Sequence, residues 1–262
     1  SAGAIQTPAL LLRSGLTNPN IGKHLRLHPA TALWARVPEL VNPWEGATQA
    51  RYVNDWTDLT GDGYGVLYET APLTPAFGSG FVNWRSGAQH LERMQDLKHM
   101  LGVAIIVRDK GPGGTVKIGK EGEPIASYVL SPGDTELLMK GFEGAAKIAE
   151  GAGATQVYTT HHKTVGYTPG KQSIESFMTE VRKAGATPAT LALAALHIMG
   201  TARMGGSAEI SAGDPDGETG EVKNLVVADG SCFPTASGVN PMISIEAIAY
   251  MNAKRLAARL TA

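Results

Sequence analysis

The chain lacks the features that mark several common classes of protein. It contains one cysteine, Cys232, in 262 residues, so an internal disulfide is excluded and the redox compartment stays open. Its formal net charge is −1, which leaves no electrostatic footprint for nucleic acid. No apolar run reaches the roughly 20 residues that a membrane-spanning helix needs. The sequence therefore predicts a soluble protein with no nucleic-acid partner and no transmembrane segment, and it leaves the compartment open, with the cytoplasm and a membrane periphery as the two alternatives.

Two further absences concern cofactors and metals. The glycine-rich stretches 61–65 and 151–153 lack the Gly-x-Gly-x-x-Gly spacing after a buried strand, so we interpret them as turns rather than phosphate-binding loops. His161 and His162 have no cysteine nearby and no partner at ligand spacing, so no metal site is predicted. What is present is a composition typical of a core-forming globular enzyme, with 43% hydrophobic and 18% charged residues.

Two segments near the C-terminus carry the chemistry. The first is His197-Ile-Met-Gly-Thr-Ala-Arg-Met-Gly205, in which a histidine ends an apolar run and a Gly-Thr turn follows. The second runs from Asn224 to Met242 and contains Gly238-Val-Asn-Pro241. Loops held by rigid elements often present catalytic groups, and His197 and Asn240 can share one substrate. A packing role remains the alternative for a lone histidine, and the second segment argues against it.

The second segment has the pattern of a strand, a turn and a helix. Residues 224–228 form a short apolar β-type run, Asp229-Gly230-Ser231 breaks it, and residues 243–260 have helical spacing of apolar side chains. Amides at such a helix start favour electron-rich oxygens. An acidic residue at a strand end suits sugar or ribityl hydroxyls. The start of this helix is therefore predicted to hold a cofactor ring, with Asn240 at its reactive edge.

These residues resemble the C-terminal signature of the glucose-methanol-choline (GMC) family of flavin oxidoreductases. Residues 3–16, Gly-Ala-Ile-Gln-Thr-Pro-Ala-Leu-Leu-Leu-Arg-Ser-Gly-Leu, resemble that family's second signature, except that Thr17 stands where a glycine is usual. Residues 7–22 and 238–245 are similar to the long-chain (fatty) alcohol oxidase branch. The resemblance implies FAD, an alcohol substrate, and O₂ or another electron acceptor. It assigns catalysis to His197 and Asn240, and cofactor binding to Asp229, Gly230, Asn240, Pro241 and Met242.

The resemblance also implies a fold and a missing partner. The expected fold is α/β plus α+β, in which part of a Rossmann-like FAD-binding domain joins an antiparallel-sheet substrate-binding domain. We expect residues 1–34 and 189–262 to belong to the first domain, and residues 35–188 to form the second. Because family members are roughly twice as long and open with the phosphate-binding loop, we expect an N-terminal FAD-binding half as a separate chain or cleaved fragment.

Local patterns add further expectations. Thr7-Pro8 is expected to open a short helix ending at Arg13. The expected strands and helices elsewhere are residues 65–70, 103–108, 116–118 and 125–130, and residues 88–101 and 135–151, the last with Asp134 as its N-cap. His24 and His28 are interpreted as local hydrogen-bonding residues of the second-signature region, with a position near FAD as an open alternative. The tryptophans are interpreted as core residues, one or two of which line an apolar substrate pocket.

The chemistry expected from these pieces is the oxidation of a primary alcohol to an aldehyde. A neutral imidazole at His197 can accept the hydroxyl proton, and Asn240 can hydrogen-bond the same oxygen, while the hydride goes to flavin. Many family members have a second histidine where Asn240 stands, so His197 carries the role of base alone. Two alternatives stay open: a non-redox relative, such as a hydroxynitrile lyase or a flavin photoenzyme, and a structural piece that completes another chain.

Overall fold

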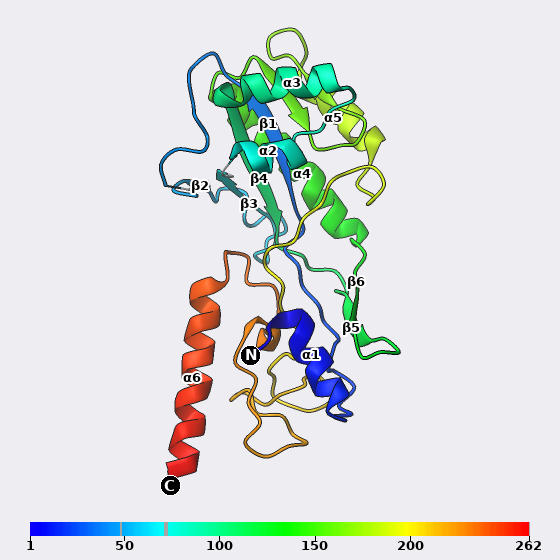
Figure 1. The fold of residues 1–262 in the computed structure, drawn as a ribbon, viewed down its shortest axis with the longest axis vertical. Coiled ribbons are helices and arrows are strands. Elements are labelled where there is room, and N and C mark those ends of the chain that lie inside the picture. The colour runs from blue at the N-terminus through cyan, green and yellow to red at the C-terminus, as the bar shows by residue number, and fades with distance from the viewer. Residues whose placement is uncertain (48, 71–72, 262) are drawn as a thin grey trace. The chain divides into compact units, whose positions relative to one another are not determined.

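The computed structural model describes residues 1–47, 49–70 and 73–261, which divide into two compact units (Figure 1). Unit 1 contains residues 1–28, 108–131 and 195–262, and unit 2 contains residues 29–107 and 132–194. The sequence-based division placed residues 108–131 in the middle domain, and here the structure differs. Those residues belong to unit 1 because their backbone pairs with the N-terminal segment: Leu25 bridges Gly114, and the Val116 amide donates to the Gly22 carbonyl at 2.6 Å.

Unit 2 is built on a six-stranded sheet in which every neighbouring pair of strands is antiparallel. The strand order is β2-β3-β4-β1-β7-β8. The strands are β1 (Ala30–Arg36), β2 (Tyr52–Val53), β3 (Val66–Thr70), β4 (Met100–Val107), β7 (Gln156–Thr159) and β8 (Gly166–Tyr167). An antiparallel sheet in this part of the chain agrees with the expected fold class. The central strands are rich in β-branched and apolar residues, which suits a sheet that is buried on both faces.

Helices cover this sheet. They are α2 (Pro75–Phe81), α3 (Gly87–Gln95), α4 (Pro132–Gly151) and α5 (Ile174–Ala184), with the 3-10 helix η1 (Asp96–His99). Helix α4 lies on β4 and β3, and two glycines permit its close approach. A Cβ at Gly141 would lie 2.5 Å from the Ile105 side chain, and one at Gly144 would lie 2.1 Å from the Tyr68 hydroxyl. Larger residues at either position would therefore push the helix off the sheet.

Some of the helix and strand boundaries predicted from the sequence in unit 2 are wrong. The helix expected over residues 88–101 ends at Gln95, and β4 begins at Met100. The cause is a tertiary contact: Met100 of β4 pairs with Arg36 of β1, and the Arg36 guanidinium donates a hydrogen bond to the Asp96 carboxylate at 3.0 Å. Asp134 lies in the first turn of α4, since the helix begins at Pro132, where a missing amide hydrogen costs nothing. Trp34 is fully buried, as the core interpretation of the tryptophans expected, but that interpretation is wrong for Trp44 and Trp84, which are 39% and 51% exposed.

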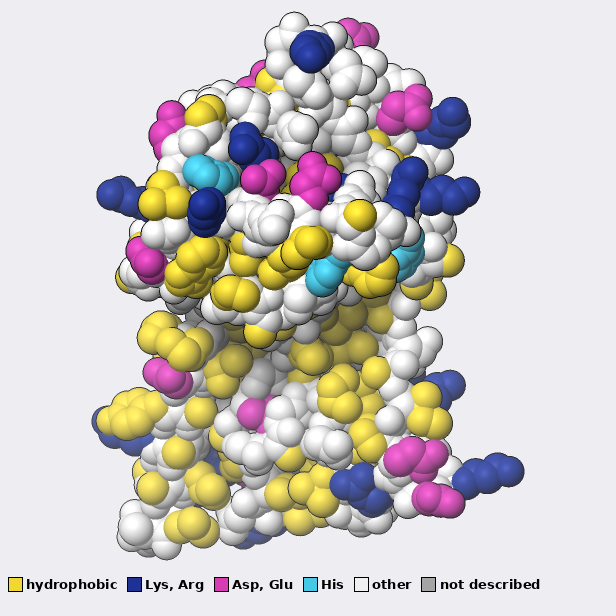
Figure 2. Space-filling model, turned by 45° about the horizontal axis from the view of Figure 1, so that its top comes forward, with side chains coloured by type: hydrophobic (Ala, Val, Ile, Leu, Met, Phe, Trp, Pro, Cys, Tyr) yellow, Lys and Arg dark blue, Asp and Glu magenta, His cyan; other side chains and the backbone are white. Residues whose placement is uncertain are grey.

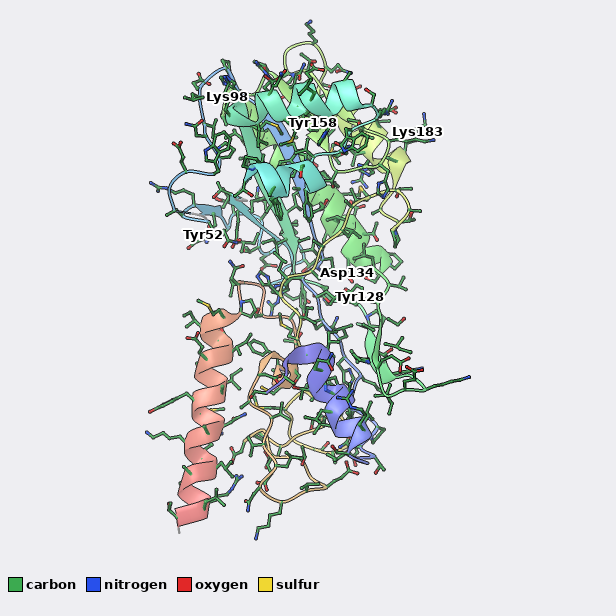
Figure 3. All side chains as sticks on the ribbon, viewed as in Figure 1. Tyr52, Lys98, Tyr128, Asp134, Tyr158 and Lys183 are labelled. Atoms are coloured by element: carbon green, nitrogen blue, oxygen red, sulfur yellow. The ribbon has the colours of Figure 1, made fainter. Side chains whose placement is uncertain are left out.

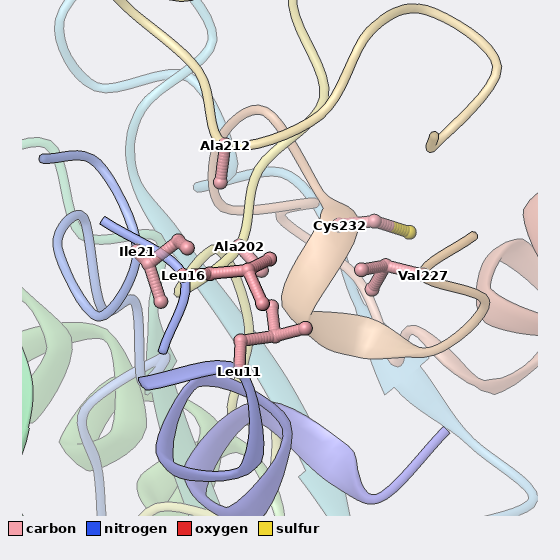
Figure 4. Close-up of a cluster of buried hydrophobic side chains, with 7 residues drawn as sticks. All are labelled: Leu11, Leu16, Ile21, Ala202, Ala212, Val227 and Cys232. Atoms are coloured by element: carbon pink, nitrogen blue, oxygen red, sulfur yellow. The ribbon is translucent and has the colours of Figure 1, made fainter. Parts of the chain in front are cut away.

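Unit 1 contains α1 (Gly3–Arg13), the hairpin β5 (Thr115–Ile118) and β6 (Pro124–Ser127), the 3-10 helix η2 (Gly230–Cys232) and α6 (Met242–Thr261). Helix α1 packs against both β5 and η2. Side chains from the beginning and end of the chain form its core (Figure 4), namely Leu11, Leu16, Ile21, Ala202, Ala212, Val227 and Cys232. The strand expected over 125–130 is the shorter β6, which pairs only with β5.

A proline inside α1 links this helix to the segment that carries His197. The helix begins at Gly3, four residues before the expected start, so Pro8 lies within it. A proline has no amide hydrogen, and the Ala4 carbonyl therefore lacks its usual donor four residues on. The Thr201 hydroxyl takes that place, donating to the Ala4 carbonyl at 2.6 Å in a buried position. Thr201 follows His197 by four residues, so α1 fixes the backbone of the His197 segment.

Helix α6 is attached to unit 1 along one side only. Asn252 is its one fully buried residue among those described, and its side-chain amide donates to the Val227 carbonyl at 3.0 Å. On the other side Met242, Ile243 and Tyr250 are each more than 60% exposed. Figure 2 shows such apolar side chains on the left, where Figure 1 places α6, with basic side chains among them. Among the described residues, no helix combines the length and apolar character needed to cross a membrane.

The strand predicted over residues 224–228 is wrong. Only Val226 forms a β-bridge there, to Glu218, and Asn224 has a φ of 63°. The Asn224 amide donates to the Glu218 carboxylate, and the Val227 amide donates to the Gly217 carbonyl. The apolar run is therefore a loop edge that packs into the core of unit 1, because local side-chain bonds replace a neighbouring strand.

Candidate functional site

The segment that carries His197 runs between two other parts of unit 1. Met199 exchanges both backbone hydrogen bonds with Arg26, at 2.8 and 3.0 Å, and the Gly22 amide donates to the Thr201 carbonyl at 2.7 Å. On its other side, Gly200 donates to the Gly230 carbonyl at 3.1 Å. His197 itself is half-buried. The histidine thus stands at the end of a backbone that is fixed on both sides, as a catalytic group requires.

Asp229 and Gly230 form the second side of this arrangement. Asp229 is 8% exposed, and its two carboxylate oxygens accept five hydrogen bonds, whose donors are the amides of Ala2, Gly3 and Ser231 and the hydroxyls of Thr7 and Ser231. Burial alone would raise its pKa, but these donors hold the pKa of Asp229 below its ordinary value. Asp229 therefore joins the start of α1 to η2. A Cβ at Gly230 would lie 3.1 Å from the Ile198 carbonyl and 3.4 Å from Ile245 of α6.

The loop that carries Asn240 is held by Arg108. The Arg108 guanidinium donates to the Ala236 carbonyl at 3.0 Å, and a Cβ at Gly238 would lie only 2.9 Å from the Arg108 side chain. Gly238 has a φ of 80°, a conformation that favours glycine. Asn240 is exposed, Pro241 is buried, and α6 begins at Met242. The loop thus presents the Asn240 side chain at the beginning of a 20-residue helix.

His28 connects the segment that carries His197 with the loop that carries Asn240. Its side chain is 1% exposed. Its Nε2 atom accepts a hydrogen bond from the Gly238 amide at 3.0 Å, and its Nδ1 atom lies 3.3 Å from Nδ1 of His197. The two rings meet edge to face, with centroids 5.4 Å apart and planes at 89°. The structure therefore brings residues 28, 197 and 238 together, although they are far apart in sequence.

The backbone of His28 is strained and is held by a buried carboxylate. Its φ is 45°, a conformation that few residues other than glycine adopt. Asp109, fully buried, accepts the His28 amide at 3.2 Å and the hydroxyl of Tyr128 at 2.9 Å, with Arg26 3.8 Å away. Tyr128 is labelled in Figure 3. Burial raises the pKa of Asp109, although Tyr128 and Arg26 oppose that effect.

The ionisation of His28 follows from its surroundings. Burial, followed by the proximity of His197 and then Arg108, lowers the pKa of His28 to about 3. The imidazole is therefore neutral at physiological pH. His24, four residues earlier, has a pKa lowered to about 4 by burial and by nearby Arg203, Arg26 and Lys23, but its Nε2 atom contacts Asn20 instead. The His28 ring thus contacts His197, whereas His24 meets the same segment through its backbone, since a Cβ at Gly200 would lie 2.5 Å from the His24 carbonyl.

The structure places the residues predicted from sequence in two groups. Asn240 and Met242 are exposed at the start of α6, whereas Asp229 and Gly230 are buried beside the His197 segment. The sequence did not predict the contacts of His28 or the supporting roles of Arg108, Asp109 and Tyr128. These residues have no recognisable sequence signal, apart from the unusual His28-Pro29 pair. Within the described part of the chain, no group of three His, Cys, Asp or Glu side chains could hold a metal ion.

The family of the chain follows from comparison with known proteins. The GMC oxidoreductase family profile for the C-terminal part matches residues 112–249, and the N-terminal profile of the same family matches residues 1–30. The chain is 35% identical over 261 residues to the long-chain-alcohol oxidase FAO4A of Arabidopsis thaliana, an alignment that covers 95% of this chain and 35% of the relative. The chain belongs to the GMC oxidoreductase family, and it spans about a third of the length of this relative.

Solved structures show the same fold. Pyridoxine 4-oxidase from Mesorbium loti superposes with a TM-score of 0.67 at 18% identity, over 97% of this chain and 50% of that one. A variant of the formate oxidase of Aspergillus oryzae, solved to study the effect of the mutation on FAD modification, superposes with a TM-score of 0.63 at 15% identity, over 98% of this chain and 53% of that one. These similarities confirm the fold class predicted from the sequence.

Proposed function

We propose that this chain is the catalytic C-terminal part of an FAD-dependent alcohol oxidase or dehydrogenase. The observation that carries the proposal is the His28 bridge, which holds the half-buried His197 and the loop of exposed Asn240 in one cluster. An imidazole and a carboxamide on segments that one histidine links are suited to act on one oxygen atom from which a proton is removed. The family and the long-chain-alcohol oxidase relatives give the reaction class.

The residues at the start of α6 fit the ring of FAD. The first intrahelical bond at this end runs from the Ile245 amide to the Pro241 carbonyl, so the amides of residues 242–244 have no acceptor within the helix. These amide donors, together with the Asn240 carboxamide, match the oxygen and nitrogen acceptors of a flavin ring. The phosphate-binding loop is absent from this chain, and the proposed partner that supplies it is an N-terminal FAD-binding half. Bound FAD would supply the hydride acceptor.

Two side chains handle the alcohol oxygen in this proposal. His197 takes the hydroxyl proton, so that the O–H bond breaks and an N–H bond forms on its ring. Asn240 donates a hydrogen bond to the same oxygen and stabilises the negative charge that develops there. Asp229 has a different part: because its oxygens already accept five hydrogen bonds, it positions η2 and α1 behind the site. The final electron acceptor in the proposal is O₂ or another oxidant.

We propose an apolar primary alcohol as the substrate. The support comes from the long-chain-alcohol oxidase relatives. Turnover of a long aliphatic alcohol, an aryl alcohol and a sugar should be compared. Preference for the sugar would contradict this substrate class without touching the role of His197.

The decisive experiment is flavin reduction by alcohol in the complete flavoprotein. In His197→Ala, loss of the base should slow anaerobic flavin reduction by about 100- to 10,000-fold, with FAD still bound and partial recovery at high pH. Asn240→Ala should slow the step but leave its pH dependence in place. His162→Ala, which changes an exposed histidine of unit 2, is the control. Reduction of His197→Ala at the parent rate would overturn the assignment. A bound flavin that no alcohol reduces would favour the lyase, photoenzyme or structural alternatives.

A further inference from the structure

The positions of the protons in the His28–His197 pair can be worked out from the hydrogen bonds. A backbone amide can only donate, so Nε2 of His28, which accepts the Gly238 amide at 3.0 Å, carries no proton. A neutral imidazole has one proton, which must therefore be on Nδ1 of His28. That proton points to Nδ1 of His197, 3.3 Å away. Nδ1 of His197 must then be the acceptor, and neutral His197 carries its own proton on Nε2.

This arrangement restricts what His197 can do. With its proton on Nε2, the ring can donate a hydrogen bond from that atom but cannot accept a proton there. To accept at Nε2, His197 needs its proton on Nδ1, and His28 must then receive that hydrogen bond at a bare Nδ1. The proton of His28 would move to Nε2, directly opposite the Gly238 amide. Two donors cannot share that contact, so the acceptor form of His197 requires the Gly238 amide to leave His28.

We propose that His28 is a positioning residue that sets the tautomer of His197, and that the Gly238 amide controls which tautomer it sets. With the amide in place, His197 presents Nε2–H to the substrate oxygen and binds it as a donor. With the amide withdrawn, both rings change tautomer and Nε2 of His197 becomes the proton acceptor. This inference rests on the proposed function, since it names how the proposed base becomes competent.

The loop that must move also carries Asn240. Gly238 is two residues before Asn240, and Arg108 touches the loop through the Ala236 carbonyl. A shift of this loop therefore couples placement of the Asn240 side chain to the basicity of His197. The charged groups around His28 are Arg108, the Asp109 carboxylate that accepts the His28 amide, and Arg26 beside Asp109. The donor observed at Nε2 of His28 is the Gly238 amide.

The tautomers can be read directly by NMR. In the complete flavoprotein with ¹⁵N-labelled histidine, long-range ¹H–¹⁵N correlations identify the nitrogen that bears each proton. At neutral pH and without substrate, we expect the proton on Nδ1 in His28 and on Nε2 in His197. Signals are assigned by their loss in His28→Gln and His197→Gln. A resting His197 with its proton on Nδ1 would overturn the proposal. Because no substrate is present, this outcome does not depend on whether the protein oxidises alcohols.

A variant pair separates positioning from general stability. In His28→Gln the side-chain amide can donate or accept, so the single Nε2–H form of His197 should be lost and the pH midpoint of flavin reduction should shift. His24→Gln is the matched control, because His24 also lies in this segment with positive φ and a lowered pKa but contacts Asn20. His24→Gln should change neither the tautomer of His197 nor the pH midpoint of flavin reduction. Equal effects of the two variants on the His197 tautomer and on the pH midpoint would contradict the proposal. If His28→Gln fails to fold, the tautomers of His28 and His197 in the parent protein still test the proposal.

Discussion

The bond between Thr201 and the Ala4 carbonyl leads to a double-mutant prediction. Thr201 is fully buried, and its hydroxyl is the donor that Pro8 cannot provide. Replacing Thr201 by Val keeps the shape but leaves a buried carbonyl without a partner. Such a group costs about 1–3 kcal/mol of unfolding free energy. Pro8→Ala restores an amide hydrogen four residues after Ala4, so Thr201→Val should cost much less in that background.

The measurement is denaturant unfolding of four complete proteins: parent, both single variants and the double variant. The expected coupling energy is about 1–2 kcal/mol, well above the few tenths seen for independent sites. Pro8→Ala alone also increases the entropy of the unfolded chain, but that effect cancels in the cycle. Thr179→Val serves as a control, because the Thr179 hydroxyl only adds a second, exposed bond to a helical carbonyl. An identical cost of Thr201→Val with and without Pro8 would refute the reasoning.

Three further predictions concern the residues around the site. Depression of the His28 pKa from 6.5 to about 3 should make the protein about 2 kcal/mol less stable at pH 5 than at pH 8, because the unfolded chain binds the proton first. His28→Gln should remove that part of the pH dependence in unfolding curves, and an unchanged slope would contradict it. Asp229→Ala should cost more than about 3 kcal/mol and loosen the start of α1 in hydrogen exchange, since five donors lose their acceptor. Gly230→Val should cost about 1–3 kcal/mol and slow flavin reduction, because its side chain would press on Ile198 beside His197; normal activity would show that the segment can move freely.

The sequence could predict those parts of the fold that depend on local pattern. The helix expected over 243–260 is α6, and the strands expected over 65–70 and 116–118 match β3 and β5 within a residue. In each case the spacing of apolar side chains along the segment matches the period of the helix or strand that forms there. The family signatures at both ends of the chain predicted the fold class, which the solved structures confirm, and unit 1 contains both ends.

The errors arise where a distant residue decides the local structure. The helix expected to reach residue 101 stops because Met100 is needed opposite Arg36 in the sheet. The strand expected over 224–228 fails because the Glu218 carboxylate and the Gly217 carbonyl take its amides. Pro8 was expected to start a helix, and it lies inside one because Thr201, 193 residues later, supplies a replacement donor. No window of neighbouring residues contains this information.

The same reasoning explains why the roles of His197 and Asn240 could be proposed from sequence but the role of His28 could not. A catalytic residue type next to glycines and prolines is a local signal, whereas a tautomer is set by what lies on the far side of the ring. His28 acts on His197 only because its strained backbone, fixed by Asp109, turns the imidazole between the Gly238 amide and His197. Strain of this kind persists only where surrounding contacts hold it, and it is most often found at functional sites. The strained conformation of His28 therefore points to a function for this residue, and the NMR assignment of the His197 tautomer tests that function without any substrate.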